Sequence, residues 1–244
     1  MQPCRSESGN PVVAEIASLG EYFAFETHDR LHHASGWLPM GSLVDGSDAL
    51  PHRYGQVRSA LAAMAGVAAG DVEFRVAASV GQLGLVARLL CPVFGARLLG
   101  YGLPLDQARW RPVIGGVLPL SLPLDALTGM ALTSGRTRPQ LPGQIRALVG
   151  RTADLSVSPQ VLWGNVASAI NGAVRTVTDA RPDLAAAAAT LGRDLLAEPE
   201  LRGAGTGTPG QAFRRHSCCL IYRIAASSAE SREAGTFCGD CVLR

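Results

Sequence analysis

Apolar residues recur at helical spacing in several long stretches of the chain. In residues 158–181 they follow one another three or four positions apart, and Ser158 and Pro159 suit the hydroxyl cap and the first turn of a helix that ends before Pro182. The pattern predicts a body built mainly of helices. They are expected within residues 11–27, 51–67, 71–101, 158–181 and 184–196.

The most apolar passage, residues 71–101, is interrupted by charged residues and by proline. Glu73, Arg75, Arg88 and Arg97 all lie within it. These charges disfavour a membrane span, and Pro92 is expected to break a helix. We therefore interpret the passage as two buried helices that meet near Pro92, and we expect no transmembrane segment.

Strand signals are confined to a short part of the sequence. Residues 108–122 contain two β-rich runs around Gly115 and Gly116, which predicts a hairpin. In residues 124–155 the apolar runs are short and mixed, so helix and strand cannot be separated there. The expected fold class is α+β, with a helix-rich body, a small β-hairpin or sheet region and a C-terminal cysteine-cluster segment.

Composition removes some classes of function. Among the 244 residues the net charge is only +2, all 22 basic residues are arginines, and aromatic residues make up 5%. Without long basic runs or many aromatic platforms, nucleic acid is not an expected partner. The first residues lack the apolar stretch of a secretory signal, so we expect a cytoplasmic protein whose cysteines are thiols or ligands.

Four of the six cysteines are crowded near the end of the chain. Cys218 and Cys219 are adjacent, and eighteen residues later come Cys238 and Cys241, at a spacing that lets two thiolates turn toward one metal centre. Four thiolates can hold one zinc ion or one iron–sulfur cluster.

The adjacent cysteines Cys218 and Cys219 help to distinguish a zinc ion from an iron–sulfur cluster. Successive side chains on an extended backbone point to opposite sides, so Cys218 and Cys219 share a small ion only if the chain kinks between them. Structural zinc sites usually draw their ligands from two Cys-x2-4-Cys loops, and an adjacent pair fits that rule poorly. A two-iron cluster is larger and offers more ways to accept the pair, but both alternatives stay open on the residues alone.

The same residues carry a resemblance to a known family. Residues 214–223 (Arg-Arg-His-Ser-Cys-Cys-Leu-Ile-Tyr-Arg) and 238–243 (Cys-Gly-Asp-Cys-Val-Leu) resemble the C-terminal signature of ferric-siderophore reductases of the FhuF type. Residues 161–166 and the apolar stretch around Leu90 are weakly similar to the same family. The chain departs from the family pattern in the spacer between its cysteine pairs, which is longer here and is expected to form an extended surface connection.

The resemblance implies a cofactor and a reaction. Members of the family bind a [2Fe-2S] cluster through a Cys-Cys…Cys-x2-Cys motif, which here corresponds to Cys218, Cys219, Cys238 and Cys241. One electron would pass from the cluster to siderophore-bound Fe(III) and release Fe(II) in the cytoplasm. The implied partners are a ferric siderophore and an electron donor such as a ferredoxin or a flavin reductase. The alternative is a non-redox interaction module in which the four cysteines bind zinc.

Further residues are candidates for contact with the substrate or the cluster. Arg214 and Arg215 precede the cysteines and supply positive charge that favours a reduced, more negative cluster. In the body, Trp163, Asn165 and Arg111 are candidates for the siderophore pocket, although packing is the more ordinary role for Trp163 and Asn165. The expected organisation is a disordered tail (1–10), a siderophore-binding body (11–202), a linker (203–212) and a [2Fe-2S]-binding segment (213–244).

Overall fold

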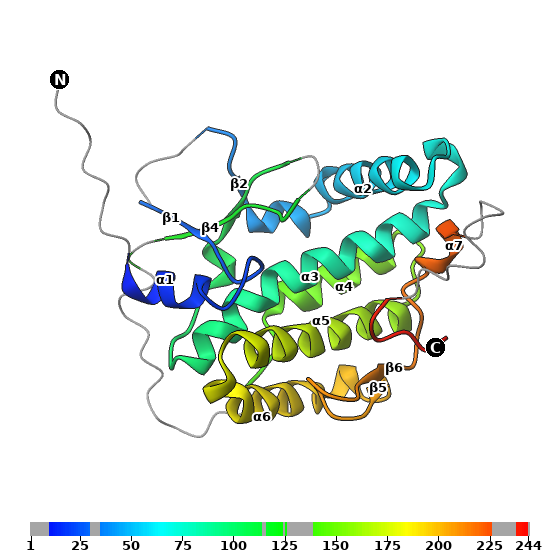
Figure 1. Cartoon of the computed structure of the whole chain (residues 1–244). Coiled ribbons are helices and arrows are strands. Elements are labelled where there is room, and N and C mark those ends of the chain that lie inside the picture. The colour runs from blue at the N-terminus through cyan, green and yellow to red at the C-terminus, as the bar shows by residue number, and fades with distance from the viewer. Residues whose placement is uncertain are drawn as a thin grey trace.

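The structure is a computed structural model, and it describes residues 10–29, 35–113, 116–123, 125, 139–225 and 238–243. Its helices form a layered bundle around one central helix, α3, which packs on α2, α4 and α5 (Figure 1). The α-helices are α1 (Pro11–Ala17), α2 (Ala49–Ala65), α3 (Phe74–Leu98), α4 (Gly143–Ala153), α5 (Pro159–Ala180), α6 (Ala185–Leu196) and α7 (Tyr222–Ala225). Together with two small sheets, they confirm the predicted α+β class.

Helix α3 corrects the prediction of two helices meeting at a proline. It runs without a break through Pro92, which is itself buried. An interior proline costs a helix about 3 kcal/mol. Each fully buried leucine contributes roughly 1.5–3 kcal/mol, so Leu85, Leu89 and Leu90 together outweigh that cost. Tertiary packing therefore overrides the local helix breaker.

Helix α3 is also long and apolar enough to cross a membrane by length and composition, with a mean hydropathy of 1.6 over an 18-residue window. Within the molecule, 78% of that window is buried. Buried core helices of soluble proteins pass the same test, so the absence of a transmembrane segment remains a prediction.

The larger sheet contains the predicted hairpin. Its strands are β1 (Glu26–His28), β2 (Leu38–Pro39), β3 (Arg109–Trp110) and β4 (Leu120–Pro123), in the order β1-β4-β3-β2. Strands β3 and β4 pair antiparallel, with Trp110 opposite Leu120, which confirms the hairpin. Gly115 lies outside the described residues, whereas Gly116 has a φ of +65°, a conformation that glycine adopts easily.

The prediction of a helix over residues 11–27 is correct only at its start. Helix α1 ends at Ala17, and Gly20 follows with a φ of +143°, which turns the chain out of the helical direction. The end of the predicted helix is strand β1, which pairs in parallel with β4. Pairing in the sheet therefore replaces the last turns of the expected helix.

The later helices agree with the sequence pattern more closely. Helix α5 begins at Pro159 and ends before Pro182, as predicted, but the Ser158 hydroxyl makes no capping hydrogen bond. Helix α6 matches the alanine-rich stretch, and part of the unassigned region 124–155 forms α4. Short 3-10 turns join these elements at Met40–Leu43, Ala69–Asp71, Leu105–Gln107, Pro182–Leu184 and Pro199–Leu201.

The second sheet brings the glycine-rich segment 203–212 to the C-terminal cysteines. Strand β5 (Gly205–Thr206) pairs antiparallel with β6 (Arg214–Arg215). Gly207, at a φ of +93°, approaches the Ala212 carbonyl so closely that a Cβ there would lie 1.9 Å from its oxygen. The segment is thus a tight hairpin, packed near one end of α5 beside the C-terminal chain (Figure 1).

Candidate metal centre

The two cysteine pairs meet next to strand β6. The Arg215 backbone N–H donates to the Asp240 carbonyl at 3.1 Å, which ties the strand to the Cys-Gly-Asp-Cys turn. That turn closes on itself where the Cys241 N–H donates to the Cys238 carbonyl at 3.1 Å. Cys219 and Cys241 are buried, whereas Cys218 and Cys238 are partly exposed. Two segments separated by eighteen residues therefore place their thiols in one region.

A buried arginine lies between these cysteines and the helical body. Arg215 is fully buried, donating from Nη1 to Asn165 Oδ1 at 2.7 Å and from Nη2 to Cys238 Sγ at 2.8 Å. Cys219 also lies close enough to favour the charged form of Arg215 and to raise its pKa. Among the described residues no carboxylate forms an ion pair with it. The cysteine sulfurs are therefore the anionic partners available to this guanidinium.

Helix α3 holds Asn165 in place from the opposite side. The Asn165 amide donates to the Ser79 carbonyl at 2.9 Å and to Gln82 Oε1 at 2.9 Å. The Ser79 hydroxyl in turn donates to the Cys219 carbonyl at 2.9 Å. All these side chains are buried, so the network from α3 through α5 to Arg215 is sheltered from water.

Asp240, between the last two cysteines, anchors their turn to α5. Its carboxylate accepts hydrogen bonds from the Ser168 hydroxyl at 2.6 Å and from the Asn171 amide at 2.9 Å. The Asn171 carbonyl oxygen accepts in turn from the Gly210 N–H at 2.7 Å. One stripe of polar side chains on an otherwise apolar helix therefore positions both the hairpin and the cysteine turn.

The residue before the first cysteine pair packs closely on α5 at Gly164. A Cβ at that position would lie 2.0 Å from Ser217 Oγ, which donates to the Gln160 carbonyl at 3.0 Å. Glycine thus allows the residue before Cys218 to lie directly on the helix.

The thiols influence one another electrostatically. The proximity of Cys238 lowers the pKa of Cys219, and the proximity of Cys219, together with burial, raises the pKa of Cys238. The Ile221 N–H and the charge of Arg215 lower the pKa of Cys219 further. Burial raises the pKa of Cys218, partly offset by the Leu220 N–H. For Arg215, burial opposes the charged form, but the adjacent sulfurs outweigh it and its pKa is raised.

These features fit a thiolate-bound iron–sulfur cluster in their chemistry. Backbone N–H groups of Leu220 and Leu243 donate to Cys218 Sγ at 3.3 Å and to Cys241 Sγ at 3.4 Å, and such bonds stabilise negative sulfur. A buried cation adds to this stabilisation. Within the part of the chain that the structure describes, however, no group of three or more His, Cys, Asp or Glu side chains is arranged so that it could hold a metal ion.

The other predicted site residues are divided between two regions. Asn165 and Arg215 lie at the cysteines, and Arg214 is exposed on the same strand as Arg215. Trp163 lies on α5 but packs, half-buried, against the hydrophobic core. Arg111 follows strand β3, and its guanidinium lies over the Trp37 ring at 5.1 Å from the centroid. Arg111 thus belongs to the sheet region and has no recorded contact with a cysteine.

Among the described cysteines, Cys91 lies apart from this site. Cys91 is buried in α3, where burial raises its pKa to about 12, consistent with a purely structural role. Cys4 lies outside the described residues.

Sequence reasoning missed several polar residues that build the site: Ser79, Gln82, Ser168 and Asp240. A signal for part of this set was present, because Asn165, Ser168 and Asn171 recur every three residues on an apolar helix. Ser79 and Gln82 also lie three positions apart on one face of α3. Nothing in the local pattern indicated that these two faces would meet the cysteine segment.

No family model, curated protein or solved structure matches the chain.

Proposed function

We propose that the chain is a ferric-siderophore reductase of the FhuF type, which binds a [2Fe-2S] cluster through Cys218, Cys219, Cys238 and Cys241. The observation that carries the proposal is the fully buried Arg215, whose guanidinium donates to Cys238 Sγ and has no carboxylate partner in the described chain. A buried guanidinium is costly without a negative partner. Thiolates bound to a cluster would supply that negative charge.

The residues around the cysteines suit electron transfer. When bound, the cluster supplies single electrons. Arg215 and the N–H groups of Leu220 and Leu243 stabilise negative sulfur, and this stabilisation grows as negative charge is added. Asn165 and Asp240 hold the arginine and the cysteine turn to the helical body, which limits rearrangement when the charge changes.

The reaction follows from the chemistry of iron. A donor such as a ferredoxin or a flavin reductase provides one electron, and siderophore-bound Fe(III) accepts it and becomes Fe(II). Fe(III) is held tightly by hydroxamate or catecholate oxygens, whereas Fe(II), with less charge, is held much less tightly. The partial exposure of Cys218 and Cys238 leaves one side of the site open to the substrate. Arg214, exposed beside it, is suited to meet an anionic ferric complex.

The proposal is tested by a single-turnover reaction under anaerobic conditions. Reconstituted protein is reduced with dithionite, freed of excess reductant and mixed with a ferric hydroxamate siderophore in the presence of a ferrous chelator. We expect one Fe(II) to be trapped for each reduced cluster. A protein that binds zinc, or whose reduced form yields no Fe(II), would refute the proposal and favour the zinc-binding interaction module.

A further inference from the structure

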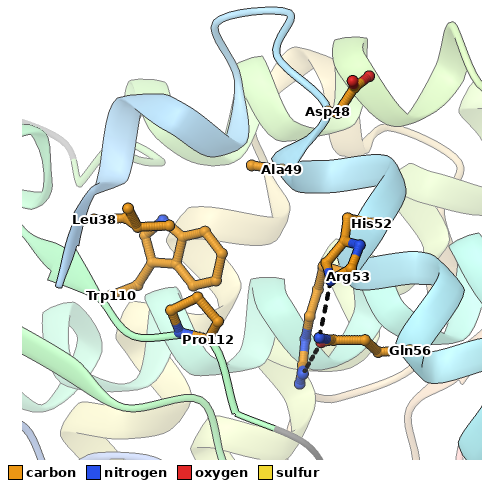
Figure 2. A pocket seen from close by; sticks show the side chains of 8 residues that line it. All are labelled: Leu38, Asp48, Ala49, His52, Arg53, Gln56, Trp110 and Pro112. Carbon is orange, nitrogen blue, oxygen red and sulfur yellow. Dashed lines mark hydrogen bonds between the residues drawn. The ribbon is translucent and has the colours of Figure 1, made fainter. Parts of the chain in front are cut away.

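A separate cavity of about 300 Å³ lies between the N-terminal end of α2 and the larger sheet. Figure 2 shows its two unlike walls. Leu38, Trp110 and Pro112 form an apolar wall on one side, and the other carries polar side chains of α2. Asp48 is at the edge, with its carboxylate directed away from the Trp110 ring (Figure 2). None of these residues belongs to the cysteine site.

Hydrogen bonds hold the polar wall in a fixed arrangement. Arg53 Nη1 donates to Gln56 Oε1 at 3.2 Å and to the Val113 carbonyl at 2.5 Å. With its oxygen on Arg53, the Gln56 amide nitrogen faces His52 Nε2 at 3.3 Å (Figure 2). The guanidinium is half-buried, and in the described chain all its partners are neutral. Its charge therefore lacks a negative partner.

A second cation reinforces this positive region. Arg53 and Arg88 both line a smaller cavity of about 130 Å³. Arg88 is 4% exposed and donates to the carbonyls of Leu118 at 2.6 Å, Tyr22 at 2.8 Å and Ala24 at 2.6 Å. Neither arginine forms an ion pair with a carboxylate among the described residues. Burial lowers the pKa of Arg88, but Glu21 lies near enough to favour its charged form, whereas no carboxylate does so for Arg53 within the described residues. Arg53 is therefore the cation available to an anion.

We propose that the larger cavity binds a small aromatic carboxylate, with its ring against Leu38 and Pro112 and its carboxylate on Arg53. A volume of about 300 Å³ suits a single-ring molecule. Trp110 is buried behind this wall, so the ring would pack on the exposed apolar surface of Leu38 and Pro112. A planar guanidinium matches the two oxygens of a carboxylate. The proposal does not depend on the cysteine cluster.

Isothermal titration of the full chain with benzoate tests this site. We expect benzoate to bind and the uncharged isostere benzamide to bind at least about tenfold more weakly, because benzamide lacks the charge that Arg53 meets. Arg53→Gln should weaken benzoate binding by a similar factor, and Arg53→Lys, which keeps the charge, should restore part of it.

Arg58→Gln is the matched control. Arg58 lies on the same helix and also donates to backbone carbonyls, those of Val72 and Gly70, but it does not line either cavity. It should leave benzoate affinity unchanged, and thermal unfolding of each variant shows whether the fold is intact. The proposal is wrong if the wild-type chain binds benzoate no better than benzamide, or if folded Arg53→Gln binds it as tightly as wild type.

Discussion

At the scale of single residues, the site depends on how one buried charge is balanced. Arg215 is fully buried, and it contacts Asn165, Cys219 and Cys238. If one partner of a buried charge is removed, the charge stays buried without compensation. This destabilises the protein by more than the intact pair stabilised it. The arginine and the cysteines are therefore expected to depend on each other both for stability and for cofactor binding.

Replacing any one of the four clustered cysteines by serine should abolish or strongly reduce bound iron and sulfide, because each thiolate is a ligand in the proposed centre. Cys91→Ser is the matched control, since Cys91 is a buried thiol on α3 away from the site. Iron and sulfide analysis after anaerobic reconstitution gives the result. Full cluster content in Cys218→Ser would show that the ligand set is wrong.

Arg215→Gln should lower the reduction potential of the cluster, because a positive charge stabilises the form that carries the extra electron. One charge a few ångströms away, at an effective dielectric constant near 20, changes the potential by on the order of 100 mV. Arg214→Gln, at the neighbouring exposed position, should shift it much less because solvent screens that charge. A redox titration followed by visible absorption compares them. Equal shifts in the two variants would contradict the role given to Arg215.

At the scale of elements, α3 and α5 decide where the site can form. Ser79 and Gln82, on one face of α3, accept hydrogen bonds from Asn165 of α5. Farther along α5, Asn171 donates to Asp240. The glycines on these helices set how closely neighbouring segments approach. Alanine substitutions at paired positions test that statement, because one member of each pair lies against a neighbour and the other does not.

On α3, Gly81→Ala should destabilise the protein by about 1–3 kcal/mol, because its Cβ would lie 2.7 Å from the ring of Tyr54. Tyr54 cannot easily move, since it is buried and its hydroxyl bonds Thr152 Oγ1 at 2.7 Å. Gly84→Ala, with no atom within 4 Å, should stabilise by roughly 0.5–1 kcal/mol through helix propensity. Denaturant unfolding measures both. Similar free energies for the two variants would contradict the close packing of α2 on α3.

On α5, Gly164→Ala should displace the Ser217 hydroxyl, break its hydrogen bond to the Gln160 carbonyl and impair cluster assembly, with about 0.5–1.5 kcal/mol of destabilisation. Gly172→Ala on the same helix meets no atom within 4 Å and should keep full cluster content. Iron content and thermal unfolding are measured together for both. A Gly164→Ala protein with normal iron content would show that the cysteine segment does not rest on α5 as described.

Helices and strands were predicted correctly where they depend on neighbouring residues in the sequence. Periodicity and flanking prolines located α5 and α6, and the glycine pair located the β3–β4 hairpin. The prediction was wrong at Pro92 and after Ala17, where burial in the bundle and pairing in the sheet overrode local preference. Arg215 was predicted as a source of positive charge from its place beside the cysteines. Asn165 was predicted for the siderophore pocket, but it is fully buried and accepts a hydrogen bond from Arg215. Ser79 and Gln82 could not be predicted, because their role depends on a contact between segments far apart in the chain.

At the scale of the whole molecule, two regions with different chemistry lie in one helical body. The cysteines and Arg215 gather near one end of α5, whereas the cavity with Arg53 and Trp110 lies between α2 and the sheet. Figure 1 shows the C-terminal segments and the larger sheet at opposite sides of the bundle. The effects of substitutions at Arg53 and at the cysteines on the free energy of unfolding should therefore add, since the effects of changes at distant sites with no shared partners are usually additive.

The central claim is that the four clustered cysteines bind a redox-active iron–sulfur cluster. Its most direct test is the visible absorption spectrum of anaerobically reconstituted protein before and after dithionite, with metal analysis of the same sample. We expect a red-brown protein with about two irons and two sulfides per chain, whose sulfur-to-iron bands bleach on reduction. A colourless protein that contains zinc and takes up no iron or sulfide would contradict the account.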